Sequence, residues 1–227
     1  ALNTQQPHLL AVMIPDITDI FYTLVFRGAQ SVCETSGYDM MAFDCAHRGL
    51  REHKFIDAIL RRRVDGAIML TEHATQEDIR RLLDFNIRVV VVGHSPQMSE
   101  IDMVGLDEID GMKQVVDYLI DRGHRRIAYL SGPMELLSGQ TRLRGYREAL
   151  ENHGVAFDES LVRYGNFTRE GVSELVESLF DRRSASQNPT ALFCGNDNMA
   201  IEAVHNLIRM GFRVPEDVAV AGFDNIP

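Results

Sequence analysis

Polar side chains stand where a short apolar run of the sequence stops and a helical pattern begins. Residues 190–195 form such a run, and Asn196, Asp197 and Asn198 follow it. A short apolar run before a helix predicts a parallel strand that is buried on both faces. Asn and Asp bind the free amides at a helix start, so we expect at least one of Asn196 and Asp197 to be a cap. The carboxyl ends of parallel strands are also where open α/β sheets bind ligands.

The other predicted corners carry polar and aromatic groups as well. They include Asp19, Phe21 and Tyr22 after the first apolar run, Thr71 and Glu72 after the third, His94 after the fourth and Asp224 after the last. Asp, Asn and Arg satisfy hydroxyl groups with charge-assisted hydrogen bonds, while Phe and Tyr cover the apolar faces of a sugar ring. These side chains predict a site for a small polyhydroxylated ligand. The alternatives are that Phe21 belongs to the core and that Asp224 only forms a turn.

The polar residues after the predicted strands give less support to a metal site or to catalysis than to ligand binding. Glu72, His73 and His94 could each ligate a metal ion, but their spacing matches no structural or catalytic zinc pattern. The sequence has no Gly-x-Gly-x-x-Gly after the first strand, no Gly-x-x-x-x-Gly-Lys and no Gly-x-Ser-x-Gly. We therefore expect no metal site, no cofactor and no enzymatic activity.

A regular alternation of strands and helices must position these corners. Apolar runs at 9–14, 38–43, 64–70, 88–92 and 103–106 alternate with helical patterns at 21–36, 49–63 and 76–85. The rhythm then starts again, with helices at 110–122, 141–152, 169–182 and 199–210 and strands at 126–130, 161–165, 190–194 and 218–223. This order predicts two α/β halves, 7–104 and 106–227, each with a parallel sheet. We expect the two halves to be hinged around a central cleft that both line.

Composition bounds the class of protein. The 227 residues are 45% hydrophobic, and 33 acidic against 23 basic residues give a net charge of −10. A chain this acidic is a poor partner for nucleic acid by itself, because phosphate contacts supply most non-specific affinity. Three cysteines, two of them in apolar patterns, suit reduced buried thiols in the cytoplasm. No apolar run approaches the length of a membrane span and the first residues lack a secretory signal pattern, so we expect a cytoplasmic protein without a membrane partner.

Four motifs add a family resemblance that covers essentially the whole chain. They are Arg-Gly-His-Arg-Arg-Ile-Ala-Tyr-Leu-Ser-Gly-Pro at 122–133, Arg-Leu-Arg-Gly-Tyr at 142–146, Gly-Asn-Asp-Asn-Met-Ala at 195–200 and Arg-Val-Pro-Glu-Asp-Val-Ala-Val-Ala-Gly-Phe-Asp at 213–224. In this order they resemble the effector domain of lactose-repressor/galactose-repressor family regulators. The chain is also similar, more distantly, to periplasmic sugar-binding proteins. The resemblance implies two Rossmann-like subdomains with the type I periplasmic-binding-protein-like fold.

The resemblance also implies what the protein does. It predicts the sensor domain of a bacterial transcriptional regulator, which binds a small sugar, sugar acid or related metabolite and couples closure to DNA binding. Operator DNA would be bound through an N-terminal helix-turn-helix that this chain lacks, and the complete protein would be a homodimer. The family continues past the last motif, so we expect the second subdomain to be truncated at its C-terminal end. A periplasmic sugar-binding protein of a transport system is the alternative.

Individual residues can be carried over from the family pattern. Asp19, Phe21 and Tyr22 stand where the family often has Asn-Pro-Phe-Phe, so the two rings would cover the ligand and Asp19 would bind a hydroxyl. Gly93 and His94 replace the Asp-Arg of many members, and together with 70–73 they resemble gluconate-type repressors, which hints at a sugar acid. Arg142 matches the arginine that grips the effector, Phe167 a cleft aromatic, and Asn196 and Asp224 two polar contacts. Alternatively, Arg142 is a surface residue at a helix start and Phe167 belongs to the core.

Overall fold

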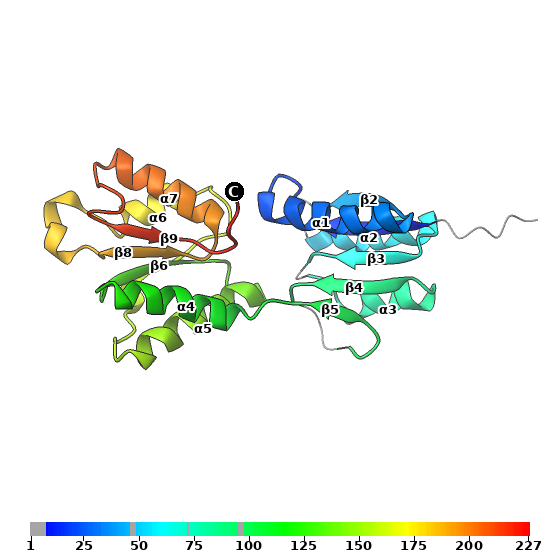
Figure 1. The fold of residues 1–227 in the computed structure, drawn as a ribbon, viewed down its shortest axis with the longest axis horizontal. Helices are drawn as coiled ribbons and strands as arrows, with labels where there is room; N and C mark the ends of the chain where they lie inside the picture. The colour runs from blue at the N-terminus through cyan, green and yellow to red at the C-terminus, as the bar shows by residue number, and fades with distance from the viewer. Residues whose placement is uncertain (1–7, 46–48, 72, 95–97) are drawn as a thin grey trace, which may run out of the picture. The chain divides into compact units, whose positions relative to one another are not determined.

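A computed structural model describes residues 8–45, 49–71, 73–94 and 98–227. The chain divides into two compact units, Ala1–Leu106 and Asp107–Pro227 (Figure 1). Each unit contains one parallel sheet flanked by helices, which confirms the predicted α/β class with two parallel sheets. No described helix is both long enough and apolar enough to span a membrane.

The first unit is built on a sheet whose described strands follow the order β2-β1-β3-β4-β5. Its strands are β1 Leu9–Ile14, β2 Asp39–Asp44, β3 Gly66–Met69, β4 Arg88–Val92 and β5 Asp102–Val104, and its helices are α1 Ile20–Ser36, α2 Gly49–Arg62 and α3 Gln76–Asp84. Ala11 and Met13 of β1 pack into a core with α2 and α3, while Val12 and Ile14 pack with α1. The uninterrupted apolar run of β1 is therefore explained by burial on both faces of the sheet.

The second unit is built in the same way, with strand order β7-β6-β8-β9. Its strands are β6 Ile127–Ser131, β7 Val162–Tyr164, β8 Ala191–Cys194 and β9 Ala219–Ala221, and its helices are α4 Glu108–Asp121, α5 Leu137–Asn152, α6 Val172–Glu177 and α7 Asp197–Arg209. Leu130 and Leu192 share a core with α6 and α7 on one face. On the other face Tyr129 stacks on Tyr146 of α5, with ring centroids 4.8 Å apart. Both faces of this sheet are thus covered by helices, which leaves its strand ends as the place for a site.

Two helices differ from the sequence prediction by more than two residues at an end. The helix expected at 169–182 is only Val172–Glu177, and it begins late because Gly171 at the N-cap has a left-handed backbone (φ 78°) through which a helix cannot run. Helix α5 begins at Leu137 rather than 141, because its N-cap, Leu136, makes no side-chain cap bond that a sequence pattern could reveal. Arg142 therefore lies in the second turn of α5 and does not open the helix.

The cysteines are buried thiols, as the sequence suggested. The structure describes all three, Cys33, Cys45 and Cys194, and buries each of them. Burial raises the pKa of the Cys194 thiol, and the pKa of Cys33 is raised for the same reason. A thiol with a raised pKa stays protonated at neutral pH, so neither is activated as a nucleophile.

Candidate functional site

Arg142 is the centre of a buried cluster at the carboxyl edge of the second sheet. Its side chain is only 10% exposed. Nε donates to Oε1 of Glu108 at 2.8 Å, and Nη2 lies 2.7 Å from the same oxygen. Nη1 donates to the carbonyl oxygen of Gly195 at 2.6 Å, directly after β8. The structure therefore excludes the alternative that Arg142 is an ordinary surface residue.

Two aromatic rings and a second carboxylate complete this cluster. The guanidinium carbon of Arg142 lies 4.3 Å from the ring centroid of Phe223 and 5.1 Å from that of Phe167. Such contacts with aromatic rings attract a cation electrostatically. Oδ1 of Asp224 lies 3.7 Å from Nη1. Asp224 has a positive φ of 110°, so it forms a turn and also reaches the arginine.

The Phe167 ring packs against strand ends where glycines leave room for it. A Cβ atom on Gly132, after β6, would lie within 2.0 Å of the Phe167 ring, and one on Gly195 within 3.2 Å. Phe167 itself has a left-handed backbone with φ 63°. Nδ2 of Asn196 donates to the carbonyl oxygen of Phe167 at 2.7 Å, which ties this turn to the start of α7. The Phe167 ring packs against the hydrophobic core beside α6 and α7, so it belongs partly to the core. It also borders the candidate site.

Asn196 has a structural role that the sequence anticipated. Its Oδ1 accepts from the backbone N of Met199 at 3.1 Å, so Asn196 is the N-cap of α7. Oδ2 of Asp197 accepts from the backbone N of Ile226 at 2.8 Å. The expectation that at least one of the two caps the helix is confirmed. Contact between Asn196 and a ligand stays a prediction.

The structure brings together Arg142, Phe167, Asn196 and Asp224, and it adds two residues that sequence reasoning missed. Glu108 and Phe223 both contact Arg142. Phe223 had a signal, because it lies inside the Gly-Phe-Asp motif next to Asp224. Glu108 had none, because an acidic residue in the first turn of a helix is usual for electrostatic reasons alone.

The candidate residues of the first unit follow neighbouring strands of its sheet. Asp19, Phe21 and Tyr22 come after β1, Thr71 after β3 and His94 after β4, and β1, β3 and β4 are adjacent. Asp19 is the N-cap of α1 and accepts from the backbone N of Phe21 at 2.9 Å. The Phe21 and Tyr22 rings meet edge to face, with centroids 5.3 Å apart. Glu72, which was also predicted to contact the ligand, lies outside the described residues.

Thr71 and His94 complete this group, and neither belongs to a metal centre among the residues described. Thr71 is 4% exposed, and its Oγ1 accepts from the backbone N of His73 at 3.1 Å. His94 is half-buried after β4. Within the described ranges no three His, Cys, Asp or Glu side chains gather closely enough to hold a metal ion.

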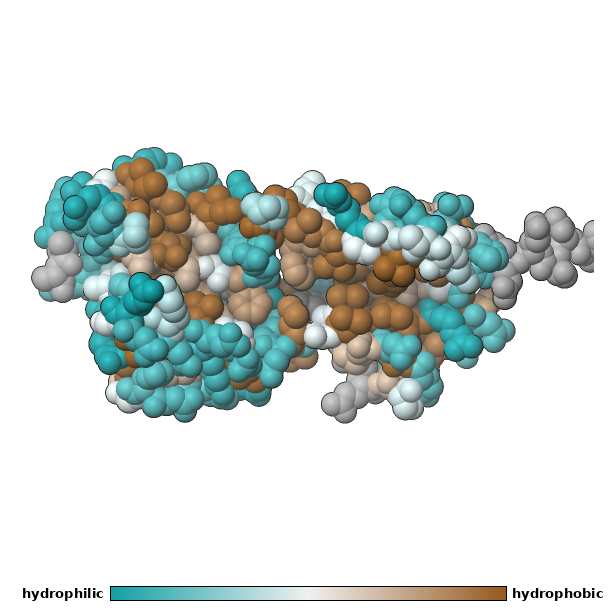
Figure 2. Space-filling view, in the orientation of Figure 1, coloured by the Kyte–Doolittle hydropathy of each residue, from teal (hydrophilic) through white to brown (hydrophobic). Residues whose placement is uncertain are grey.

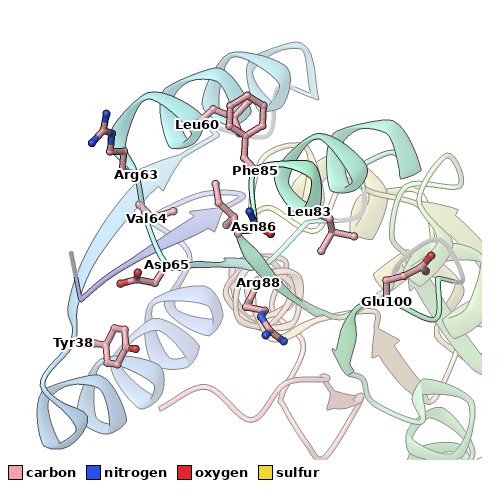
Figure 3. A pocket seen from close by; sticks show the side chains of 11 residues that line it. Tyr38, Leu60, Arg63, Val64, Asp65, Leu83, Phe85, Asn86, Arg88 and Glu100 are labelled. Atoms are coloured by element: carbon pink, nitrogen blue, oxygen red, sulfur yellow. The ribbon is translucent and has the colours of Figure 1, made fainter. Parts of the chain in front are cut away.

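A separate hollow of about 740 Å³ opens at the opposite edge of the first sheet (Figure 3). Its lining includes Tyr38, Asp65 and Arg88, which stand at the amino ends of β2, β3 and β4, and Phe85 after α3. The candidate ligand residues of the first unit follow the carboxyl ends of their strands. None of them lines this hollow, so it is distinct from the candidate site.

The two parallel sheets with these strand orders define a type I periplasmic-binding-protein-like domain, and residues 116–227 match a family model described as a periplasmic binding protein-like domain. The repressor CytR of Escherichia coli strain K12 is 35% identical over a match of 229 positions, which covers 99% of this chain and 65% of CytR. The structure of the transcriptional regulator CelR with cellobiose has a TM-score of 0.84 and 30% identity, and the match covers 97% of this chain and 68% of that one.

A sugar-binding transcriptional regulator of the LacI family from Escherichia coli, solved with phosphate, matches with a TM-score of 0.79 and 28% identity. That match covers 98% of this chain and 80% of the solved one. The chain belongs to the LacI family of transcriptional regulators. It spans 65% of the length of the relative CytR, which is slightly less than two thirds.

Proposed function

We propose that this chain is the effector-sensing part of a bacterial transcriptional repressor, and that it binds a small polyhydroxylated molecule at the Arg142 cluster. The observation that carries the proposal is a buried guanidinium close to two aromatic rings, with Asp224 3.7 Å away, at the carboxyl edge of a parallel sheet. Aromatic faces suit the apolar faces of a sugar ring, and charged groups suit its hydroxyls. CelR, a relative of the same fold, is solved with cellobiose. Family membership favours a regulator over a transport protein.

An uncharged sugar is a better candidate than a sugar acid. Two carboxylates, those of Glu108 and Asp224, already approach the Arg142 guanidinium. A third carboxylate brought in by the ligand would be repelled by both, and buried charges interact more strongly than exposed ones. The first-unit residues Asp19, Phe21, Tyr22, Thr71 and His94 stay predicted contacts.

The regulatory output is part of the same proposal. A ligand shifts a conformational equilibrium only by its differential affinity for the two states, and that difference is the free energy available to change DNA binding. Operator DNA would be bound by a helix-turn-helix segment of the full-length protein, because the relative CytR is named an HTH-type repressor and this chain carries a net charge of −10.

A thermal-shift screen of sugars, sugar acids, nucleosides and purines tests this function. A ligand at a hundred times its Kd stabilises the native state by about 2.7 kcal/mol, which is a clear shift of the melting temperature. We expect an uncharged polyol to give such a shift and its acid counterpart to give less. A panel in which no polyhydroxylated compound shifts the melting temperature would contradict the proposal.

The complete protein is expected to be a homodimer in which α1 takes part. Leu24 and Val32 of α1 are 40% and 64% exposed, and apolar residues gather on the surface around this helix (Figure 2). Exposed apolar patches mark association surfaces, and two-fold dimers are the commonest assemblies. The double change Leu24→Glu with Val32→Glu should shift the full-length protein from dimer to monomer in sedimentation, whereas Gln30→Glu on the same helix should not. A wild-type protein that sediments as a monomer at micromolar concentration would rule out the dimer.

A further inference from the structure

Glu108 contacts one edge of the Arg142 guanidinium and leaves the end of the group to other partners. An arginine has five N–H donors, in a fixed fork. One edge, Nε and Nη2, faces a single oxygen of Glu108 at 2.8 and 2.7 Å. Nη1 uses one N–H for the carbonyl of Gly195. One N–H on each of Nη1 and Nη2 is therefore left, and that of Nη2 lies at the end of the fork.

Two aromatic rings also lie close to the guanidinium. Phe223 and Phe167 lie 4.3 and 5.1 Å from its central carbon. The end of the fork is not held by Glu108, and Oδ1 of Asp224 stands 3.7 Å from Nη1. This separation exceeds the 2.7–3.2 Å of a normal N–H···O bond, so a ligand oxygen has less to displace here than at Glu108.

We propose that Glu108 is a positioning residue for the effector: it holds the side edge of the Arg142 guanidinium so that the end of the fork, beside Asp224, is what grips a pair of adjacent hydroxyls. Glu108 is 5% exposed and lies in the first turn of α4, 34 residues from Arg142 in the sequence. Its charge-assisted bonds to Nε and Nη2, together with the bond from Nη1 to the carbonyl of Gly195, fix the orientation of the guanidinium. The proposal rests on the effector site described above.

One arm of the test needs no effector. Arg142→Ala leaves a space next to the two rings and in front of Glu108, and the probe for that space is methylguanidinium. We expect methylguanidinium at millimolar concentration to raise the melting temperature of Arg142→Ala, and to leave that of the double variant Arg142→Ala with Glu108→Gln unchanged. Methylammonium, which has the same charge without the fork, is the control ion. An equal rise in both variants would overturn the role of Glu108.

Should Arg142→Ala not fold, NMR of the wild-type chain gives the same answer. The Nε–H signal of Arg142, assigned by its loss in Arg142→Lys, should exchange slowly with water in the wild type and fast in Glu108→Gln. A signal that is equally protected in both proteins would contradict the proposal.

The second arm uses the polyol found in the thermal-shift screen. Glu108→Gln should weaken its binding about tenfold or more, because a misdirected fork loses a charge-assisted bond. Glu148 lies on α5 and forms an exposed ion pair with Lys113. The control variant Glu148→Gln should bind the polyol as the wild type does. Unchanged binding of the polyol by Glu108→Gln would contradict the positioning role of Glu108. A screen in which no compound binds would count against the proposed function, and the methylguanidinium experiment would then test the role of Glu108 alone.

Discussion

Replacing Arg142 with alanine is expected to destabilise the second unit by about 3–5 kcal/mol, the range for removing one partner of a buried ion pair. The side chains of Arg142 and Glu108 are 10% and 6% exposed, so little water reaches the carboxylate after the change. The carbonyl of Gly195 loses its donor, and the rings of Phe167 and Phe223 lose their contacts with the cation. The measurement is the denaturant midpoint of the second-unit transition.

Arg144→Ala is the matched control for this prediction. Arg144 lies on the same helix, but its side chain is 62% exposed and its partner Glu148 is 39% exposed. Exposed pairs of this kind are worth about 0–1 kcal/mol, so the control should unfold almost as the wild type does. An Arg142→Ala protein that is as stable as Arg144→Ala would show that the buried pair does not hold the site together.

Gly132→Ala is expected to cost about 1–3 kcal/mol, because it overpacks the strand end under Phe167. The added Cβ would lie 2.0, 2.3 and 2.4 Å from three atoms of the Phe167 ring, so the ring must move. Movement of the ring also disturbs its contact with the Arg142 guanidinium. Unfolding by denaturant measures the loss, and the effector found in the screen should bind Gly132→Ala more weakly.

A double variant separates this crowding from other effects of the new methyl group. In Gly132→Ala with Phe167→Ala the clash is gone, so the two changes together should cost less than the sum of the single changes. Gly28→Ala is the control, because a Cβ on this α1 glycine would meet nothing within 4 Å, and it should be neutral or stabilise by about 0.4–1 kcal/mol. Strict additivity of Gly132→Ala and Phe167→Ala would contradict the packing described here.

Local pattern was sufficient for the strands and for the corners that carry the site. The prediction of a strand at 88–92 matches β4 residue for residue, because a short run of β-branched residues between polar neighbours has few other interpretations. Asn196 was predicted as a cap because side-chain type and helix start are adjacent in the sequence. The side chains that follow neighbouring strands could be grouped because parallel strands bring their carboxyl ends to one edge.

The interior of the site could not be predicted from local pattern. Arg142 takes its partners from segments that are 34 and 53 residues away, at Glu108 and Gly195. Neither partner differs in sequence from an ordinary first-turn acid or an ordinary strand-end glycine. The start of the helix near 172 was also missed, since Gly171 has a left-handed backbone that helix propensity does not reveal.

The most direct test of the account is a calorimetric titration of the polyol from the screen into the wild-type chain and into Arg142→Lys. Lysine keeps the positive charge but has no planar fork, so it tests the geometry of the grip as well as the place of binding. We expect one site per chain, and a loss of binding free energy of about 2 kcal/mol or more in Arg142→Lys. Arg144→Lys should bind as the wild type does. A folded Arg142→Lys protein that binds the same polyol with unchanged affinity would show that the effector site is elsewhere.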